Sequence, residues 1–481
     1  MSNYKTVFFT LGVLLIVLGF SMLVPITIQL IYSEFNSTFI ISSIITITFG
    51  ALFFLANIDH NRSLSTQQAF LLTALSWIGV AIFGSIPFIF SDLNLSLTDA
   101  FFESMSGITT TGATIINNLS DTPKAILSWR AILQWLGGIG IIVMAITLMP
   151  IMNIGGMQLL KISSGDSSEK ILPKSKQISL RLVLIYFSLT LLCAFFYKIC
   201  GMNFFDSLTH SMTTIATGGF SNYNQSIGFF ESAKIEYVSI VFIILGSIPF
   251  ISYIKFLSGN KKIIFKDEQI RLFFKLIFFS ILILFIYLTI INKSIFEIQL
   301  RAIIFNVVSI LTGTGYVTKE FDQWGNFPLI FFLLLMFIGG CAGSTTCGIK
   351  VFRVHMLYFF LKNQLLKIIY PRAIINLKYN NDIVQDKLIA SIISFIYLYI
   401  IIFFVISALL TLTGLNFITA VSGAASSISN VGPGLGNEIG PNSNYASLPS
   451  ASKWILSAGM ILGRLEIFAI LVIFLPSFWR N

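Results

Sequence analysis

The sequence predicts an all-α membrane protein that repeats one helical unit four times after two additional transmembrane helices. The 481 residues are 56% hydrophobic and only 10% charged, with a mean hydropathy of +0.88. Soluble domains carry roughly 25% charged residues, so this chain could not cover its surface with polar groups in water. Apolar stretches of about 20 residues, the length that crosses a bilayer as a helix, recur along the chain. A glycine-rich pattern returns four times between them.

Ten apolar stretches are long enough to span a membrane. They lie at 6–32, 37–56, 67–91, 128–150, 179–200, 235–257, 270–292, 327–347, 386–414 and 453–478. The first is too long for the apolar region of a signal peptide and lacks a cleavage site, so we expect it to be retained. Four shorter stretches can form about three turns of helix but cannot cross. They lie at 97–109, 204–215, 299–311 and 416–428.

From the third span onward, the order of long span, short helix, glycine turn and long span occurs four times. Glu103, His210, Asn306 and Gly423 each stand nine residues before a turn glycine, and those glycines, 112, 219, 315 and 432, are 107, 96 and 117 residues apart. A period of this length indicates four copies of a membrane unit. We therefore divide the chain into 1–62 (two N-terminal helices), 63–160, 161–262, 263–380 and 381–481 (repeats 1 to 4).

The positive charge is unevenly placed. The loops 161–181, 255–271 and 350–387 hold 17 of the 30 Lys and Arg residues. Such asymmetry is typical of cytoplasmic loops, so the net charge of +10 does not indicate a nucleic-acid partner. We expect these loops and both termini to face the cytoplasm, and the glycine turns to be reached from outside.

The four glycine turns contain no acid, base or side chain that commonly binds metals. They read Thr110-Thr111-Gly112-Ala113, Thr217-Gly218-Gly219-Phe220, Gly313-Thr314-Gly315-Tyr316 and Asn430-Val431-Gly432-Pro433. Irregular backbone at membrane depth is tolerated inside protein or along a water-filled path. Glycine permits the backbone angles that turn carbonyls inward, and a ring of carbonyl oxygens can replace the water shell of a cation.

Close helix packing is the alternative explanation for small residues in membrane helices. One motif would leave that explanation open, but four copies at matching positions favour a ring around one axis. If the short helices point their C-terminal ends to its centre, their partial negative charges favour a cation there.

The motifs together resemble the TrkH/TrkG membrane subunits of bacterial potassium uptake systems, in the superfamily that includes KtrB and the plant HKT transporters. The resemblance covers nearly the whole chain and is carried by ESMSGITTTGAT (103–114), HSMTTIATGGFSN (210–222), LTGTGYVT (311–318), GGCAGSTTCGIKVFR (339–353), SNVGPGLG (429–436) and GRLEIF (463–468). It implies four pseudo-symmetric M1–P-loop–M2 repeats around one pore. A serine in the first turn accompanies Na⁺ transport in some plant relatives, so Gly112 implies K⁺.

The resemblance also implies which residues form the selectivity filter, with K⁺ as the transported metal ion. They are Thr110, Thr111, Gly112, Thr217, Gly218, Gly219, Gly313, Thr314, Gly315, Asn430, Val431 and Gly432.

A gate below the filter is implied at the intramembrane loop 339–350. Its candidate residues are Gly343, Ser344, Thr345, Gly348 and Lys350, together with Arg464. Thr346 and Cys347 stand where the family more often has glycine. The alternatives are a kinked packing point for the loop and a salt bridge to Glu466 for Arg464, although helix residues two apart do not face each other.

The resemblance implies partners as well. A TrkA-like cytosolic subunit that binds NAD or ATP would dock on the basic loops, and the chain would form a homodimer in the bacterial inner membrane. The basic segment 351–385 alternatively reads as a helix lying in contact with membrane lipid. No cofactor is expected in this chain.

Three other functions remain to be compared with K⁺ uptake. A Na⁺ or mixed monovalent cation transporter would share the fold. A solute symporter is expected to show inverted halves and more intramembrane acids. A membrane enzyme needs a nucleophile or an acid–base pair in its spans, and the sequence offers none. The four cysteines have neither zinc-binding nor redox spacing.

Overall fold

The computed structural model of the chain describes residues 4–58, 64–147, 171–260, 262–291, 296–372, 377–380 and 382–480. It confirms an all-α membrane fold. The only strands in the described part are β1 (Lys378–Tyr379) and β2 (Asp382–Ile383), which form one short hairpin. Seven of the described helices are long and apolar enough to cross a membrane, and two bent helix pairs bring the number to nine. Predicted residues 148–150 of the fourth span and 161–170 of the first basic loop lie outside the described residues.

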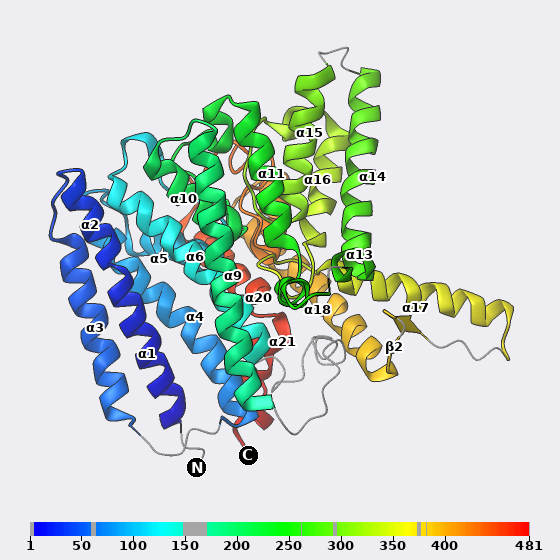
Figure 1. Ribbon diagram of the computed structural model, residues 1–481, viewed down its shortest axis with the longest axis horizontal. Helices are drawn as coiled ribbons and strands as arrows, with labels where there is room; N and C mark the ends of the chain where they lie inside the picture. The colour runs from blue at the N-terminus through cyan, green and yellow to red at the C-terminus, as the bar shows by residue number, and fades with distance from the viewer. Residues whose placement is uncertain are drawn as a thin grey trace.

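The N-terminal helices form a tight hairpin at one side of the molecule (Figure 1). α1 (Lys5–Ser21) and α2 (Leu23–Ile31) together make the first span, and α3 (Thr38–Ala56) returns alongside α1. A Cβ on Gly12 would lie 2.7 Å from the carbonyl oxygen of Gly50. Small residues therefore allow the two backbones to approach closely, which is how apolar helices associate in lipid.

Four helix–turn–helix units follow. Their members are α4 (Thr66–Ile89), α5 (Leu97–Ile108) and α6 (Lys124–Thr147); α9 (Ile171–Ile199), α10 (Phe204–Ile215) and α11 (Ala233–Ser247); α14 (Glu268–Ile291), α15 (Phe296–Leu311) and α16 (Asn326–Ile338); and α18 (Asp386–Leu412), α19 (Phe417–Ser429) and α20 (Ser450–Arg464). The second helix of each unit is the predicted short helix. Three of these begin at an N-cap side chain, Ser96, Asn203 or Asn416, that accepts the backbone N–H three residues on at 2.7–3.1 Å.

Three predicted spans are interrupted. The stretch 235–257 divides into α11 and α12 (Phe250–Leu257), bent by 88°, because Pro249 cannot continue the helix. The stretch 327–347 ends as α16 at Ile338, where Gly339 takes a φ of 75°. The stretch 453–478 divides into α20 and a second part made of α21 (Ile467–Leu471) and η4 (Val472–Phe474). The two parts are bent by 110°. Arg464 therefore ends a helix and does not lie in the middle of one.

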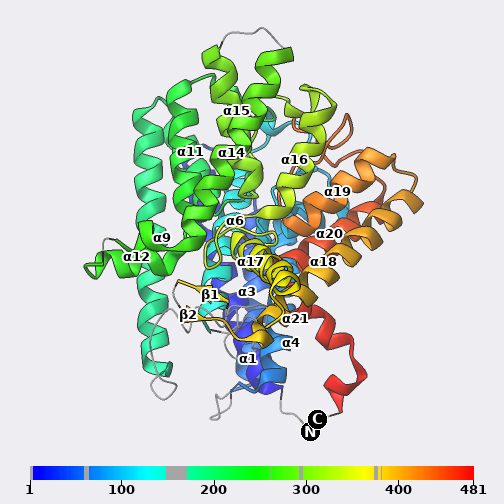
Figure 2. The ribbon, with the colours of Figure 1, turned by 90° about the vertical axis from the view of Figure 1, so that its right-hand side faces the viewer.

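The basic segment 351–385 forms one helix only in its first part. α17 (Val351–Ile369) projects away from the bundle, and short elements such as α13 (Ile263–Lys266) lie near its base (Figure 1). The start of α1 and the C-terminal turn η5 (Pro476–Trp479) lie at one end of the molecule in both views (Figures 1 and 2). Large apolar side chains are exposed around the bundle, for example Phe278 at 61% and Phe404 at 63%. Such exposure suits contact with lipid chains.

Candidate functional site

The four glycine turns share one backbone conformation. The residue two positions before each turn glycine has a positive φ, and so does the glycine itself. The φ values are 53° and 86° at Thr110 and Gly112, 49° and 77° at Thr217 and Gly219, 74° and 79° at Gly313 and Gly315, and 53° and 106° at Asn430 and Gly432. Non-glycine residues rarely adopt this region. Its occurrence at the same position in each unit shows that the four turns are structural copies.

The hydrogen bonds that end each short helix are also repeated. In the first turn, Thr110 N–H donates to the Gly107 oxygen at 3.0 Å and Thr111 N–H donates to the Ser106 oxygen at 2.9 Å. The same two bonds, at 2.8–3.3 Å, recur in the other three turns. Each turn thus begins as the C-terminal cap of a short helix. The negative ends of the helix dipoles therefore all lie at the turns.

The turns pack into a closed ring. A Cβ on Gly112 would overlap the Gly218 carbonyl oxygen, one on Gly219 the Thr314 oxygen, and one on Gly315 the Val431 oxygen. The ring closes because a Cβ on Gly432 would lie 2.7 Å from the Thr111 oxygen. Each glycine therefore faces the carbonyl that precedes the next glycine, and no larger residue fits without displacing a neighbouring turn.

Most carbonyls of this ring are free of hydrogen bonds. Within the described part of the chain, no donor reaches the oxygens of Thr111, Thr314 or Val431. The Gly218 oxygen differs, because it accepts Nε2–H of Gln134 at 2.6 Å. A carbonyl has two lone pairs, so this bond leaves one available. The ring can therefore offer oxygen ligands from all four units to an ion without using a charged side chain.

The threonine hydroxyls hold the turns in shape. Oγ1 of Thr111 and of Thr314 each lie 2.8 Å from the hydroxyl two residues before them. Asn430 Nδ2 donates to Thr111 Oγ1 at 2.9 Å and so ties the fourth turn to the first. Predicted filter residues of all four turns are thus brought together, and their hydroxyls serve partly as supports.

Two residues behind the ring carry a buried charge pair that the sequence did not identify as functional. Glu103 on α5 accepts a hydrogen bond from Arg130 Nε on α6 at 2.6 Å, with both side chains at most 1% exposed. Glu103 also accepts the N–H of Ile115 at 2.9 Å, after the first turn, while Arg130 donates to the Ser221 oxygen, after the second, at 2.8 Å. The sequence does carry a signal for this pair, because an acidic and a basic residue stand in otherwise apolar stretches.

Gln134 is a second support that the sequence did not identify. Besides its bond to Gly218, its Oε1 accepts the N–H of Phe220 at 3.0 Å. One buried amide thus holds both sides of Gly219, the glycine of the second turn. A glutamine in an apolar helix gives little local signal of this role.

The segment 339–350, here called the gate segment, leaves the end of α16 and returns to it. Lys350 N–H donates to the Ile338 oxygen at 2.8 Å, which closes the segment into a loop. Gly343 and Gly348 have φ values of 79° and 80°. The oxygen of Gly343 accepts the N–H of Phe250 at 2.9 Å, so the loop packs into the break between α11 and α12.

Thr345 joins the gate segment to the ring. Its hydroxyl accepts a hydrogen bond from Thr217 Oγ1 at 3.1 Å and lies 3.0 Å from the Gly246 oxygen of α11. Ser344 and Thr345 are both buried, and Ser344 Oγ donates to the Cys341 oxygen at 2.6 Å. The gate segment therefore lies directly against the second turn.

Arg464 reaches the same segment from the end of α20. Its Nη1 donates to the Thr345 oxygen at 3.2 Å and contacts Cys347 Sγ, and its Nη2 donates to the Gly137 oxygen of α6 at 2.9 Å. The side chain is 2% exposed. Arg464 forms no ion pair with Glu466, whose carboxylate faces Arg353 and Lys350 instead. The guanidinium instead bridges the gate segment and the first repeat.

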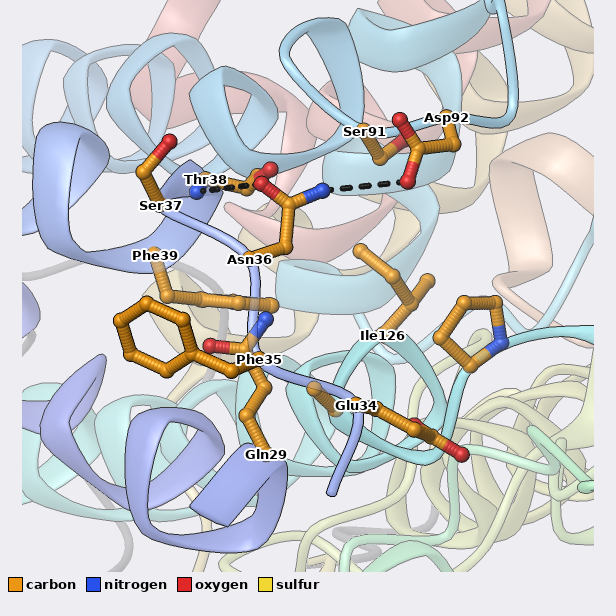
Figure 3. A pocket seen from close by; sticks show the side chains of 12 residues that line it. Gln29, Glu34, Phe35, Asn36, Ser37, Thr38, Phe39, Ser91, Asp92 and Ile126 are labelled. Atoms are coloured by element: carbon orange, nitrogen blue, oxygen red, sulfur yellow. Dashed lines mark hydrogen bonds between the residues drawn. The ribbon is translucent and has the colours of Figure 1, made fainter. Parts of the chain in front are cut away.

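A separate cavity of about 570 Å³ lies where α2 turns into α3, beside the C-terminal end of α4 and the start of α6 (Figure 3). Asp92 Oδ2 accepts Asn36 Nδ2–H at 3.0 Å, and Glu34 Oε2 accepts the Lys124 N–H at 3.0 Å. The cavity shares no residue with the turns or the gate segment. Among the described residues, no group of three His, Cys, Asp or Glu could hold a metal ion.

Comparison with known proteins places the chain among ion transporters. The family profile TrkH, described as a cation transport protein, matches residues 36–480. The chain is 39% identical to the Trk system potassium uptake protein TrkI of Halomonas elongata, over 98% of this chain and 96% of that protein. It is 34% identical to TrkH of Escherichia coli K12 over the full length of both. The crystal structure of the potassium transporter TrkH from Vibrio parahaemolyticus superposes with a TM-score of 0.91, at 33% identity, covering 99% of this chain and all of that one.

Proposed function

The chain belongs to the TrkH family of cation transport proteins, which are ion transporters and not enzymes, and we propose that it takes up K⁺ through the ring formed by its four glycine turns. The observation that carries this proposal is the closed contact of each turn glycine with the carbonyl of the next turn. Names of relatives that include potassium uptake support the choice of ion.

In this proposal, an ion sheds its water in the ring and is bound by backbone oxygens. The oxygens of Thr111, Thr314 and Val431 accept no hydrogen bond within the described residues, so their lone pairs are available to an ion. The four helix C-termini add partial negative charge without adding an acid. Binding by neutral dipoles is favourable enough for entry and weak enough for release, as conduction requires.

The gate segment and Arg464 would hold the path shut below the ring. Two features support this role: the contact of Thr345 with Thr217, and the hydrogen bond of Arg464 to the Thr345 oxygen. A buried guanidinium repels cations at short range, and water cannot screen it there. Gly343, Gly348 and Lys350 would be the points at which the segment changes its backbone angles.

A cytosolic partner of the TrkA type, which binds NAD or ATP, would bias this gate. The exposed basic side chains on and after α17 support this assignment, since α17 follows the gate segment directly. Docking can shift the gate only if the partner binds its open and closed states unequally. The same proposal has the chain as a homodimer in the inner membrane, with both termini on the cytoplasmic side.

The decisive experiment measures radiolabelled Rb⁺ and Na⁺ uptake into liposomes that contain the purified protein, with and without an imposed pH gradient. We expect Rb⁺ uptake well above Na⁺ uptake. Equal uptake of both ions would instead support a mixed cation transporter, and no uptake of either, even by an Arg464→Ala variant that lacks the gating charge, would contradict the proposal.

A further inference from the structure

The break between α20 and α21 carries two opposite charges that point to different parts of the gate. Arg464, the last residue of α20, contacts the middle of the gate segment at Thr345. Glu466, two residues later, accepts a hydrogen bond from Arg353 Nη2 of α17 at 2.8 Å, and its other oxygen lies 3.9 Å from Lys350 Nζ. The gate segment is thus held at its middle by one residue and at its end by the other.

Glu466 and the two cations beside it are withdrawn from water. Side-chain exposures are 6% for Glu466, 2% for Arg353 and 8% for Lys350. Arg353 also stacks over the ring of Phe395 on α18, 3.9 Å from its centroid. A buried carboxylate is tolerated only when cations or donors compensate it, so the position of Glu466 depends on these two partners.

Both ends of this contact sit on unusual backbone. Glu466 has φ 57° and ψ 109°, and Lys350 has φ 72° and ψ 136°. Neither is glycine, so both conformations are costly and persist only where the surroundings enforce them. Each residue stands immediately before a helix, Glu466 before α21 and Lys350 before α17. The ion pairs therefore hold two helix breaks against each other.

One of the two carboxylate oxygens of Glu466 accepts no hydrogen bond from the described residues in this arrangement. Glu466 Oε1 has no hydrogen-bond partner in the described part of the chain, and Lys350 Nζ stands about 1 Å beyond hydrogen-bond length from it. A small movement of the gate segment would bring Lys350 onto Oε1. Glu466 could then keep one cation while the other leaves.

We propose that Glu466 is a positioning residue of the gate, which couples α17 to Arg464 by holding Lys350 and Arg353 against the break in the last membrane helix. This inference rests on the proposed gating function. α17 projects from the bundle (Figure 1), so a partner that moves it must either separate Arg353 from Glu466 or carry Glu466 with it. Carrying Glu466 along moves Arg464 through one intervening residue, Leu465, whereas separating Arg353 removes a contact that holds the break in place.

The test compares Glu466→Gln, Arg353→Gln, the double variant and the wild type in liposomes, without any partner. Loss of the contact between Glu466 and Arg353 should raise basal Rb⁺ uptake about tenfold, a factor that corresponds to ~1.4 kcal/mol. The ratio of Rb⁺ to Na⁺ uptake should stay at the wild-type value, because the ring is untouched. The double variant should equal the larger single effect, since both changes remove the same contact.

Glu236→Gln is the matched control, because it removes the 2.9 Å pair between Glu236 and Arg301, away from the gate. It should leave basal uptake unchanged. If Glu466→Gln cannot be purified as a folded protein, Arg353→Gln and Lys350→Gln carry the test by the same criterion. Basal uptake at the wild-type level in the folded variants overturns the inference. If neither the wild type nor any folded variant, Arg464→Ala included, takes up Rb⁺, the proposed function is overturned instead.

Discussion

The carboxylate of Glu103 and the guanidinium of Arg130 form a buried ion pair of 2.6 Å that ties the first glycine turn to the second. The pair is 27 residues apart in sequence and links α5 to α6. It also places Arg130 over the ring of Phe220, 4.1 Å from its centroid, in the second turn. The geometry of two of the four turns therefore depends on one charged contact.

Glu103→Gln should destabilise the protein and weaken ion discrimination. The change leaves the Arg130 charge buried without its counter-ion, which typically costs about 3–5 kcal/mol. We expect a lower midpoint of thermal unfolding in detergent and a lower ratio of Rb⁺ to Na⁺ uptake. Glu236→Gln serves as the comparison, because Arg301 is 20% exposed and can be solvated. Equal effects of the two changes would contradict a special role for Glu103.

Gly112→Ser should reduce discrimination between K⁺ and Na⁺. A Cβ at this position overlaps the Gly218 oxygen, so the second turn must move and the ring must change size. We expect the uptake ratio to fall about tenfold, the factor that ~1.4 kcal/mol gives.

Gly201→Ser is a matched control for that change. Gly201 has a φ of 110°, and nothing lies within 4 Å of its would-be Cβ. It therefore tests backbone strain without contact with the ring. Unchanged Rb⁺ to Na⁺ uptake in Gly112→Ser, or an equal loss in Gly201→Ser, would remove the support for the ring as the filter.

Arg464→Ala should raise uptake in the absence of a partner. The change removes a buried positive charge and the hydrogen bond to the Thr345 oxygen, so the gate segment loses its hold from α20. Shortening the segment between Gly343 and Gly348 should have the same effect. Arg480→Ala, at the exposed C-terminal end, should not. Wild-type basal uptake in both gate variants would place the gate elsewhere.

Gln134→Leu should lower ion discrimination without raising basal uptake. The change leaves the Phe220 N–H and one lone pair of the Gly218 oxygen unpaired inside the protein. Each such loss costs about 1–3 kcal/mol, enough to displace the second turn. Uptake of Rb⁺ and Na⁺, measured separately, checks both parts of the expectation. A rise in the uptake of both ions by the same factor would point to the gate and not to the turn.

Replacing Lys362, Lys367 and Arg372 by Gln should weaken binding of the cytosolic partner. All three are exposed, on or just after α17. Exposed charge contacts are worth about 0.2–1 kcal/mol each, so affinity should fall about tenfold, and the wild-type complex should weaken with salt. A pull-down with the purified partner measures binding, and uptake measures the nucleotide response.

The matched control for docking replaces Lys198, Lys234 and Lys319, which are exposed near the short helices. It removes the same charge from the other end of the molecule. Binding should then be unchanged. Full binding by the α17 variant, or equal loss in both, rules out this segment as the docking site.

Much of the fold could be predicted because its signals are local. Span length and glycine spacing depend on neighbouring residues, and α3, α5 and α18 begin within two residues of their predicted starts. The interrupted spans could be predicted less well. The residues next to Pro249 and next to Glu466 are apolar, so each of the two stretches reads as one continuous span. In the structure a new helix begins directly after each of these two residues. Hydropathy measures transfer into lipid and does not report the direction of the backbone.

The sequence by itself determined the number of units, their order and the position of each glycine turn, because each is written in residue type and spacing along one segment. Only the tertiary structure decided which turn faces which, and which charges meet. Arg353 and Glu466 are 113 residues apart, Arg464 and Thr345 are 119 apart, and the contact between Gly432 and Thr111 closes the ring across most of the chain. Such pairings form when four units pack around one axis, and only that packing brings the partners within bonding distance.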